Sequence, residues 1–252
     1  MSAAQRSKSK NTTSAADKKA KLISYVGIAV VASIVIGILT FAFLNKNSVT
    51  EGPVANPNPD AVLPKGVDPV SFGLKVASGP AGANTLQIFE DFQCPACGSF
   101  EASFGSAIQE IIDGNQINVF FHPMNFLDKN LPGSNSSSLR SANALGCAAD
   151  AGQAVNYHKA LFANQPQNEG DGYSDTILLA LGMAAGIPTD GATPFSKCLQ
   201  DGKYYEWVAN SNEYAFANGV EGTPTVWLNG IPLPDSAYQS PDAFVAAVLK
   251  GN

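Results

Sequence analysis

The sequence predicts an α/β domain behind a single N-terminal transmembrane helix, and three observations support this fold class. An alternating apolar run at residues 84–93 precedes a helical pattern and a second apolar run, an order typical of a strand–helix–strand unit. Residues 222–230 form a β-rich run that ends in an Asn-Gly pair, a strong hairpin signal. Residues 22–44 contain no charged side chain.

The uncharged segment 22–44 is long enough for a membrane anchor. A helix of this length reaches about 35 Å, and a hydrocarbon core measures about 30 Å. A cleavable signal peptide is the main alternative, but its apolar stretch is usually shorter and ends at a small-residue site, which is not evident here. The sequence therefore predicts an uncleaved, single-pass anchor in the cell membrane, inserted in the lipid bilayer.

Charge is distributed unevenly about this segment. Six of the fifteen Lys and Arg residues lie in the first 21 positions, although the whole chain has a net charge of −6. The positive-inside rule places this basic tail, residues 1–21, in the cytoplasm and the rest of the chain outside. The acidic remainder argues against a nucleic-acid partner, since phosphates require clustered Lys and Arg.

Residues 45–66 are rich in Pro, Asn and Gly, which favours an extended linker over a helix. Residues 67–252 are then long enough for one domain with its own core. Within it, we expect strands at 84–93 and 117–121 with a helix at 98–113 between them. Such a crossover makes the two strands parallel.

The motif Cys94-Pro95-Ala96-Cys97 falls between the first strand and this helix. A helix N-terminus offers unpaired N–H groups and a partial positive charge, which stabilise a thiolate at Cys94. Pro95 suits the first turn because its missing N–H is not needed there. A structural disulfide and half a zinc site are the alternatives, but the remaining cysteines do not form a second Cys-x-x-Cys pair. We therefore predict no metal site.

The C-terminal part of the domain is predicted to be a hairpin followed by a helix. The run Gly222-Thr223-Pro224-Thr225-Val226-Trp227-Leu228-Asn229-Gly230 is the first strand and its turn, and residues 231–233 are the second strand. Residues 240–249 then form the closing helix, with Ser240 as its N-cap.

The sequence FEDFQCPAC, together with GTPTVWLNG near the other end of the domain, resembles the DsbA-like thiol-disulfide oxidoreductases of the thioredoxin fold, especially membrane-anchored bacterial members. The resemblance covers about residues 70–250. It implies a thioredoxin-like fold with a helical insertion at about 138–218. It also implies that Cys94 is an exposed nucleophile, that Cys97 is a buried resolving thiol, and that Thr223-Pro224 is a cis peptide bond facing the cysteines.

Two positions depart from the family pattern. Ala96 stands where the most oxidising relatives have a histidine, and Ile88 stands where thioredoxins often have a buried carboxylate. Glu90 lies two residues further on the same strand face and is our candidate for assisting proton transfer. Both departures bear on how oxidising the cysteine pair is.

The predicted insertion contains helical runs at about 142–161, 177–185 and 195–215, and it carries Cys147 and Cys198. In an oxidising compartment this remaining pair most simply forms a structural disulfide. Two free buried thiols and a second redox centre are the alternatives. His122 and His158 are interpreted as structural, because the sequence provides no obvious catalytic partner for either residue.

The sequence therefore predicts an extracytoplasmic enzyme that donates the Cys94–Cys97 disulfide to newly exported cysteine-containing proteins through a mixed disulfide. No cofactor is expected. A reoxidising membrane partner is implied by the resemblance. Disulfide isomerase, specialised reductase and a non-catalytic tethered binding module of the same fold are the alternatives.

Overall fold

The computed structural model describes residues 58–131, 133 and 135–250. The predicted basic tail 1–21, the anchor 22–44 and residues 45–57 of the predicted linker lie outside this range. In the part of the chain that the structure describes, no helix is both long and apolar enough to cross a membrane. The transmembrane helix therefore stays a prediction.

Residues 58–66, predicted as the end of a linker, pack on the domain. The backbone N–H of Asn58 donates to the Asn210 side chain at 2.9 Å, and Asn210 donates back to the carbonyl of Asn58 at 2.8 Å. Ala61 is buried, and Leu63 packs against the helical core. Residues 58–66 therefore belong to the domain, although the predicted boundary is at residue 67, because this segment makes both hydrogen bonds and apolar contacts with it.

The described residues contain a five-stranded sheet in the order β1-β3-β2-β4-β5. Its central strands β2 (Thr85–Glu90) and β3 (Asn118–Pro123) are parallel, as predicted, and helix α2 (Pro95–Gly114) connects them. The hairpin strands β4 (Thr225–Leu228) and β5 (Ile231–Pro232) are antiparallel and extend the sheet beside β2.

Strand β1 (Leu74–Ala77) pairs antiparallel with β3 and was not predicted. Four residues are too few to show a clear two-residue period, so only pairing with β3 identifies this strand.

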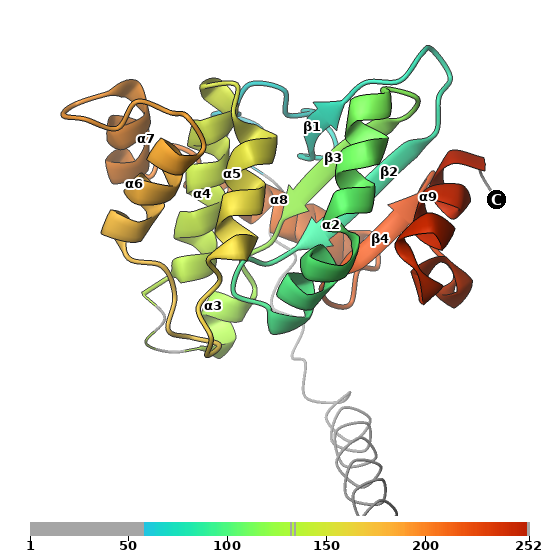
Figure 1. Ribbon diagram of the computed structural model, residues 1–252. Coiled ribbons are helices and arrows are strands. Elements are labelled where there is room, and N and C mark those ends of the chain that lie inside the picture. Colours follow the sequence, from blue (N-terminus) through green and yellow to red (C-terminus); the bar gives the residue numbers. More distant parts are fainter. Residues whose placement is uncertain (1–57, 132, 134, 251–252) are drawn as a thin grey trace, which may run out of the picture. The chain divides into compact units, whose positions relative to one another are not determined.

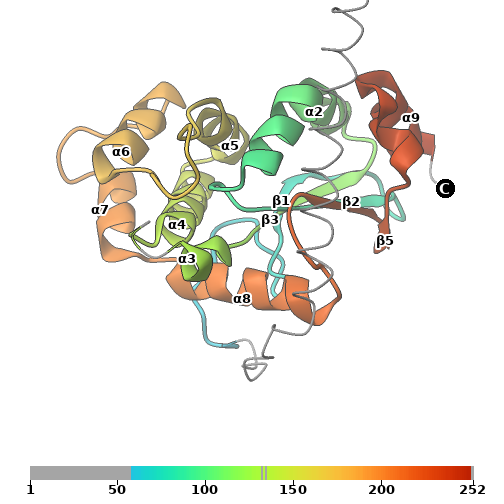
Figure 2. The same cartoon turned by 90° about the horizontal axis from the view of Figure 1, so that it is seen from below.

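Helices cover both faces of the sheet (Figures 1 and 2). Helix α2 and the closing helix α9 (Pro241–Lys250) lie on one face, and α8 (Tyr205–Ala217) lies on the other. The first face buries apolar side chains of the sheet and of both helices, among them Ile88, Ile111 and Phe244. The N–H of Ala243 donates to the Ser240 hydroxyl at 3.1 Å, which confirms the predicted N-cap of α9.

The helical insertion lies between β3 and β4, as predicted. Its helices form a group beside the sheet, with α8 running back beneath the strands (Figures 1 and 2). The bounds of its other helices are α3 (Leu127–Asn130), α4 (Ser137–Asp150), α5 (Ala154–Ala163), α6 (Asp175–Ala184) and α7 (Pro194–Asp201). A 3₁₀ turn, η2 (Asp235–Gln239), precedes α9.

Two of the helical runs predicted for the insertion are each divided into two helices. The run 142–161 separates into α4 and α5, and the run 195–215 separates into α7 and α8. At the second break Gly202 ends α7 with φ of +59°, a left-handed conformation that glycine adopts without steric cost. Apolar periodicity alone does not reveal such a break, since both helices bury apolar side chains.

Candidate active site

Cys94 and Cys97 lie where the sequence predicted them, at the end of the loop after β2 and in the first turn of α2. Cys94 is the N-cap residue, and exposed Pro95 occupies the start of the helix. Both cysteines are free thiols in the structure. Cys97 is fully buried, as expected, but Cys94 is only 8% exposed, so the expectation of an exposed nucleophile is wrong for this state.

The burial of Cys94 reflects its contact with the loop before β4. In its thiol form, Cys94 donates from Sγ to the Thr223 carbonyl at 3.4 Å. The Thr223-Pro224 peptide bond is cis, which confirms the expectation drawn from the resemblance. Residues 129 positions apart in the sequence are therefore joined at one site, between the start of α2 and the start of β4.

The pKa values of the two thiols are shifted in opposite directions. The pKa of Cys94 is lowered to about 6, chiefly by a hydrogen bond from the Cys97 thiol, with further help from the Thr223 side chain and the N–H groups of Cys97 and Ala96. The pKa of Cys97 is raised above its ordinary value, first by burial and then by its hydrogen bond to Cys94. Near neutral pH, Cys94 is therefore the thiolate and Cys97 is the thiol.

Glu90 ends strand β2 and is buried beside the cysteine pair. Its Oε2 lies 2.8 Å from Nε2 of His158 on α5, and both side chains are almost fully buried. Burial raises the pKa of Glu90 to about 8 and lowers that of His158. The contact is therefore a hydrogen bond between largely uncharged groups near neutral pH rather than a strong ion pair.

Glu101 on α2 completes this cluster. Burial, and then the charge of nearby Glu90, raise the pKa of the Glu101 carboxyl group to about 7. One ligand atom from each of Glu90, Glu101 and His158 lies within 4.8 Å of the others, a spacing that would suit a metal ion. The raised pKa values of Glu90 and Glu101 have a simpler explanation than a metal ion. The two carboxyl groups share a proton.

The sequence-based reasoning missed both neighbours of Glu90. Glu101 lies four residues after Cys97, so helical spacing alone would have placed the two on one face of α2. His158 offered no local signal, because its contact with Glu90 spans 68 residues. His122, by contrast, stacks on Phe89 within the core, with ring centroids 4.4 Å apart, as expected of a structural residue.

The loop between β2 and α2 is held by a buried carboxyl group that was not singled out in the sequence. Asp91 Oδ1 accepts from the Ser138 hydroxyl at 2.5 Å and from the Gln93 N–H at 3.0 Å. Its backbone carbonyl accepts from the N–H of Cys94 at 2.9 Å. Burial raises the pKa of Asp91 to about 7. Asp91 therefore ties the cysteine loop to helix α4.

Cys147 and Cys198 form a disulfide that joins α4 to α7, which confirms the predicted pairing. Both residues belong to the helical core, and they form one wall of a cavity of about 520 Å³. The apolar part of its lining includes Ile187, Pro194 and Phe195. The disulfide lies within the insertion and is separate from the Cys94–Cys97 pair.

Comparisons with known proteins agree with this geometry. A curated relative, the serine/threonine-protein kinase PknE of Mycobacterium tuberculosis, is 30% identical over 175 residues. The match covers 67% of this chain but only 30% of that kinase.

Two solved structures of thiol-disulfide oxidoreductase type are similar to the domain. The oxidised DsbA of Mycobacterium tuberculosis is 27% identical, covers 71% of this chain and 93% of its own, and superposes with a TM-score of 0.58. The MdbA protein of Actinomyces oris shares the fold at 24% identity and a TM-score of 0.63, covering 80% of this chain and 98% of its own.

The family model described as thioredoxin matches residues 76–248, a range that contains the cysteine pair, the helical insertion and the cis-proline strand. The chain therefore belongs to the thioredoxin family.

Proposed function

We propose that this chain is an extracytoplasmic thiol-disulfide oxidoreductase that donates the Cys94–Cys97 disulfide to exported cysteine-containing proteins. The opposite pKa shifts of the two thiols at the start of α2 carry the proposal. The similarity to the M. tuberculosis DsbA supports the reaction type. The predicted membrane anchor and the Cys147–Cys198 disulfide support an oxidising location outside the cytoplasm.

The reaction begins when a substrate thiolate attacks Sγ of Cys94 in the oxidised pair. The Cys94–Cys97 bond breaks, a disulfide forms between Cys94 and the substrate, and Cys97 leaves with the electron pair and takes up a proton. A second substrate thiolate then attacks the substrate sulfur of this mixed disulfide. Cys94 leaves as a thiolate, and the substrate has lost two electrons to the cysteine pair.

The low pKa of Cys94 favours this direction, because a stabilised thiolate is the better leaving group. A pKa of about 6 falls between about 7 for thioredoxin and about 3.5 for the most oxidising DsbA. We therefore expect a reduction potential between about −130 and −230 mV, above the thioredoxin value of about −270 mV.

Glu90 is the proposed proton donor to Cys97. Its charge would raise the pKa of Cys97, so the two groups are electrostatically coupled. With its pKa near 8, the Glu90 carboxyl group is largely protonated at neutral pH and holds a proton when Cys97 departs. Glu101, in the same cluster, is half-buried.

Substrate would approach at the cis-proline loop. The backbone of half-buried Thr223 lies beside Cys94 and comes before the start of β4, so an extended substrate segment could pair with it by strand addition. After each turnover the reduced pair requires an oxidant, which we propose is a membrane-bound partner.

Trapping of the mixed disulfide tests the reaction order. A Cys97→Ala variant whose Cys94 is first loaded with glutathione as a mixed disulfide supplies the oxidised sulfur. A reduced exported protein with a single cysteine should displace glutathione as its thiolate and accumulate as a disulfide with Cys94, because no Cys97 thiol remains to attack it. Cys94→Ala should accumulate none, since Cys97 is buried and its pKa is raised. Non-reducing gels with mass spectrometry identify the linked residue. A reduction potential below about −260 mV would overturn the donor direction and favour a reductase.

A further inference from the structure

Gln165 links the helical insertion directly to the nucleophilic cysteine. It lies in the loop after α5, and its side chain is half-buried. Its Nε2 donates to the backbone carbonyl of Cys94 at 2.9 Å and to that of Phe92 at 2.9 Å. One amide group therefore holds two carbonyls of the loop that leads into α2.

Gly98 makes room for this contact. A Cβ atom at position 98 would lie 2.1 Å from Oε1 of Gln165, far inside van der Waals contact. Glycine in the interior of a helix is less favourable than alanine, so its place in the first turns of α2 destabilises the helix. The close approach of Gln165 provides a physical reason for this glycine.

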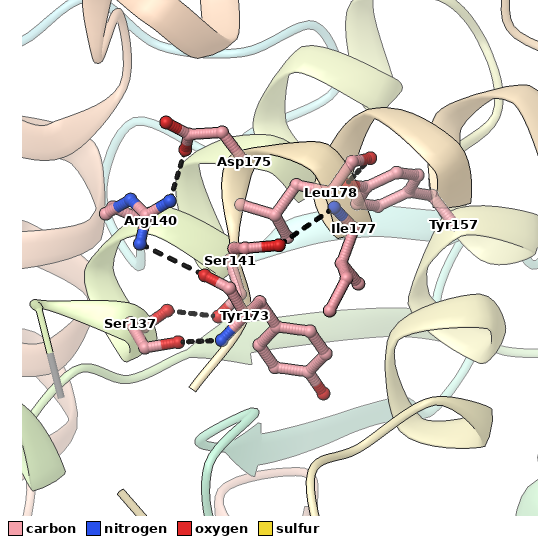
Figure 3. A network of polar contacts seen from close by, with 9 residues as sticks. Ser137, Arg140, Ser141, Tyr157, Tyr173, Asp175, Ile177 and Leu178 are labelled. Carbon is pink, nitrogen blue, oxygen red and sulfur yellow. Dashed lines mark hydrogen bonds and ion pairs between the residues drawn. The ribbon is translucent and has the colours of Figure 1, made fainter. Parts of the chain in front are cut away.

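The loop that carries Gln165 is itself anchored at both ends. At its start, the N–H of Gln165 donates to the carbonyl of Phe162 at 3.2 Å. At its end, the backbone carbonyl of Tyr173 accepts from the Arg140 side chain, and the backbone N–H of Tyr173 donates to the Ser137 hydroxyl. Arg140 also forms an ion pair with Asp175 (Figure 3).

The Tyr173 hydroxyl also reaches the cysteine loop. It donates to the Leu161 carbonyl at 2.9 Å and to the Phe92 carbonyl at 3.3 Å. The Phe92 carbonyl therefore receives hydrogen bonds from both ends of the insertion loop. Gln165 acts from a fixed support rather than from a free loop.

We propose that Gln165 is a positioning residue for the thiol-disulfide exchange proposed above, holding Cys94 at the N-cap of α2 so that its sulfur faces the helix N–H groups and Thr223. The Cys94 carbonyl also accepts the first helical hydrogen bond, from Gly98 at 3.1 Å. The Gln165 amide fixes the orientation of this peptide group and offsets the negative end of its dipole near the thiolate.

The test compares three variants by the pH dependence of Cys94 alkylation with iodoacetamide. Gln165→Met keeps a side chain of similar size over Gly98 but has no N–H donor, and Gln165→Ala removes the side chain. Both should raise the midpoint of Cys94 alkylation by roughly half to one pH unit and slow exchange at pH 6 by about three- to tenfold. Gln167→Ala is the matched control, because Gln167 is exposed in the same loop.

Gly98→Ala provides an independent arm, because the new Cβ should displace an intact Gln165. It should reproduce the midpoint shift of Gln165→Met. In the Gly98→Ala/Gln165→Ala double variant the clash is gone, so thermal stability should recover while the midpoint stays shifted as in Gln165→Ala alone.

A purely structural Gln165 would behave differently. If Gln165→Met and Gln165→Ala change the melting temperature but leave the alkylation midpoint at its wild-type value, the proposal is overturned. The alkylation midpoint requires no substrate protein. Failure of the wild-type chain to oxidise any dithiol would therefore sink the proposed function but leave this test intact.

Discussion

The chemistry of the site depends on single residues, because Cys94 and Cys97 have different surroundings and therefore different pKa values. Hydrogen bonds from the Cys97 thiol and from the N–H groups at the start of α2 lower the pKa of Cys94. Cys97 is one helical turn further in and is surrounded by apolar atoms and by Glu90, so its pKa rises. The site therefore separates an attacking and leaving thiolate from a resolving thiol that needs a proton.

Replacing Glu90 with glutamine should expose this need. We expect Glu90→Gln to slow the step that releases Cys97 by at least tenfold at pH 7, because the amide holds no transferable proton. Stopped-flow tryptophan fluorescence with a dithiol substrate measures the step. The control is Glu110→Gln, an exposed position on α2. Equal rates in the two variants would remove Glu90 from the mechanism.

Among the elements of the fold, the helical insertion has two parts with different structural roles. One part supports the cysteine loop, through Ser138 on α4 and through Gln165 and Tyr173 after α5. The other part is closed by the Cys147–Cys198 disulfide, which joins α4 to α7. Helix α4 belongs to both parts, because it carries Ser138 and Cys147.

Removing this disulfide should lower the thermal stability of the domain but change its exchange activity little. The bond closes a loop with a sequence separation of 51 residues, for which chain entropy gives a stabilisation of about 4 kcal/mol as an upper figure. We expect a Cys147→Ala/Cys198→Ala variant to melt at a lower temperature but to keep most of its exchange activity. Calorimetry and an insulin-reduction assay measure the two quantities. A folded double variant without activity would show that this pair belongs to the redox site.

At the scale of the whole molecule, folding buries several carboxyl groups whose uncharged forms are favoured. Burial raises the pKa of Glu90 to about 8, and those of Asp91 and Glu101 to about 7. The folded state thus binds protons that the unfolded chain has already released above its ordinary carboxyl pKa values. Stability should therefore fall as the pH rises through these raised values.

This dependence is best measured between pH 6.5 and 8 in a Cys94→Ala background, where the opposite contribution of the Cys94 thiolate is absent. The unfolding free energy should fall by up to about 1.4 kcal/mol per pH unit for each titrating group. Adding Glu90→Gln should flatten the slope, most clearly near pH 8. Urea titrations at fixed pH values give the slope, and an unchanged slope would mean that Glu90 is ionised throughout this range.

The predicted anchor sets the topology of the whole chain. If residues 22–44 span the bilayer with the basic tail inside, protease added to intact cells or spheroplasts should digest residues 45–252 and spare the first 21. Tags at the two termini report each side. Digestion of the C-terminal domain only after the membrane is broken would contradict the extracytoplasmic location.

Features that depend on neighbours along the chain could be predicted from the sequence. A strand, a Cys-x-x-Cys motif and an amphipathic helix follow one another within 30 residues, and local periodicity was enough to place Cys94 at a helix start. The Asn-Gly hairpin and the Ser240 N-cap are equally local. The cis peptide bond and the helical insertion, by contrast, were inferred from the family resemblance and confirmed in the structure.

The side chains that surround the cysteines could not be predicted, because they come from segments far apart in the sequence. Glu90 meets His158 across 68 residues, and Gln165 meets the Cys94 carbonyl across 71. Strand β1 is recognised by its pairing with β3, and the near-complete burial of Cys94 depends on Thr223. Local patterns record the period of an element and the face that it buries. They do not show which distant element packs against that face. The pKa values at this site depend on those long-range contacts.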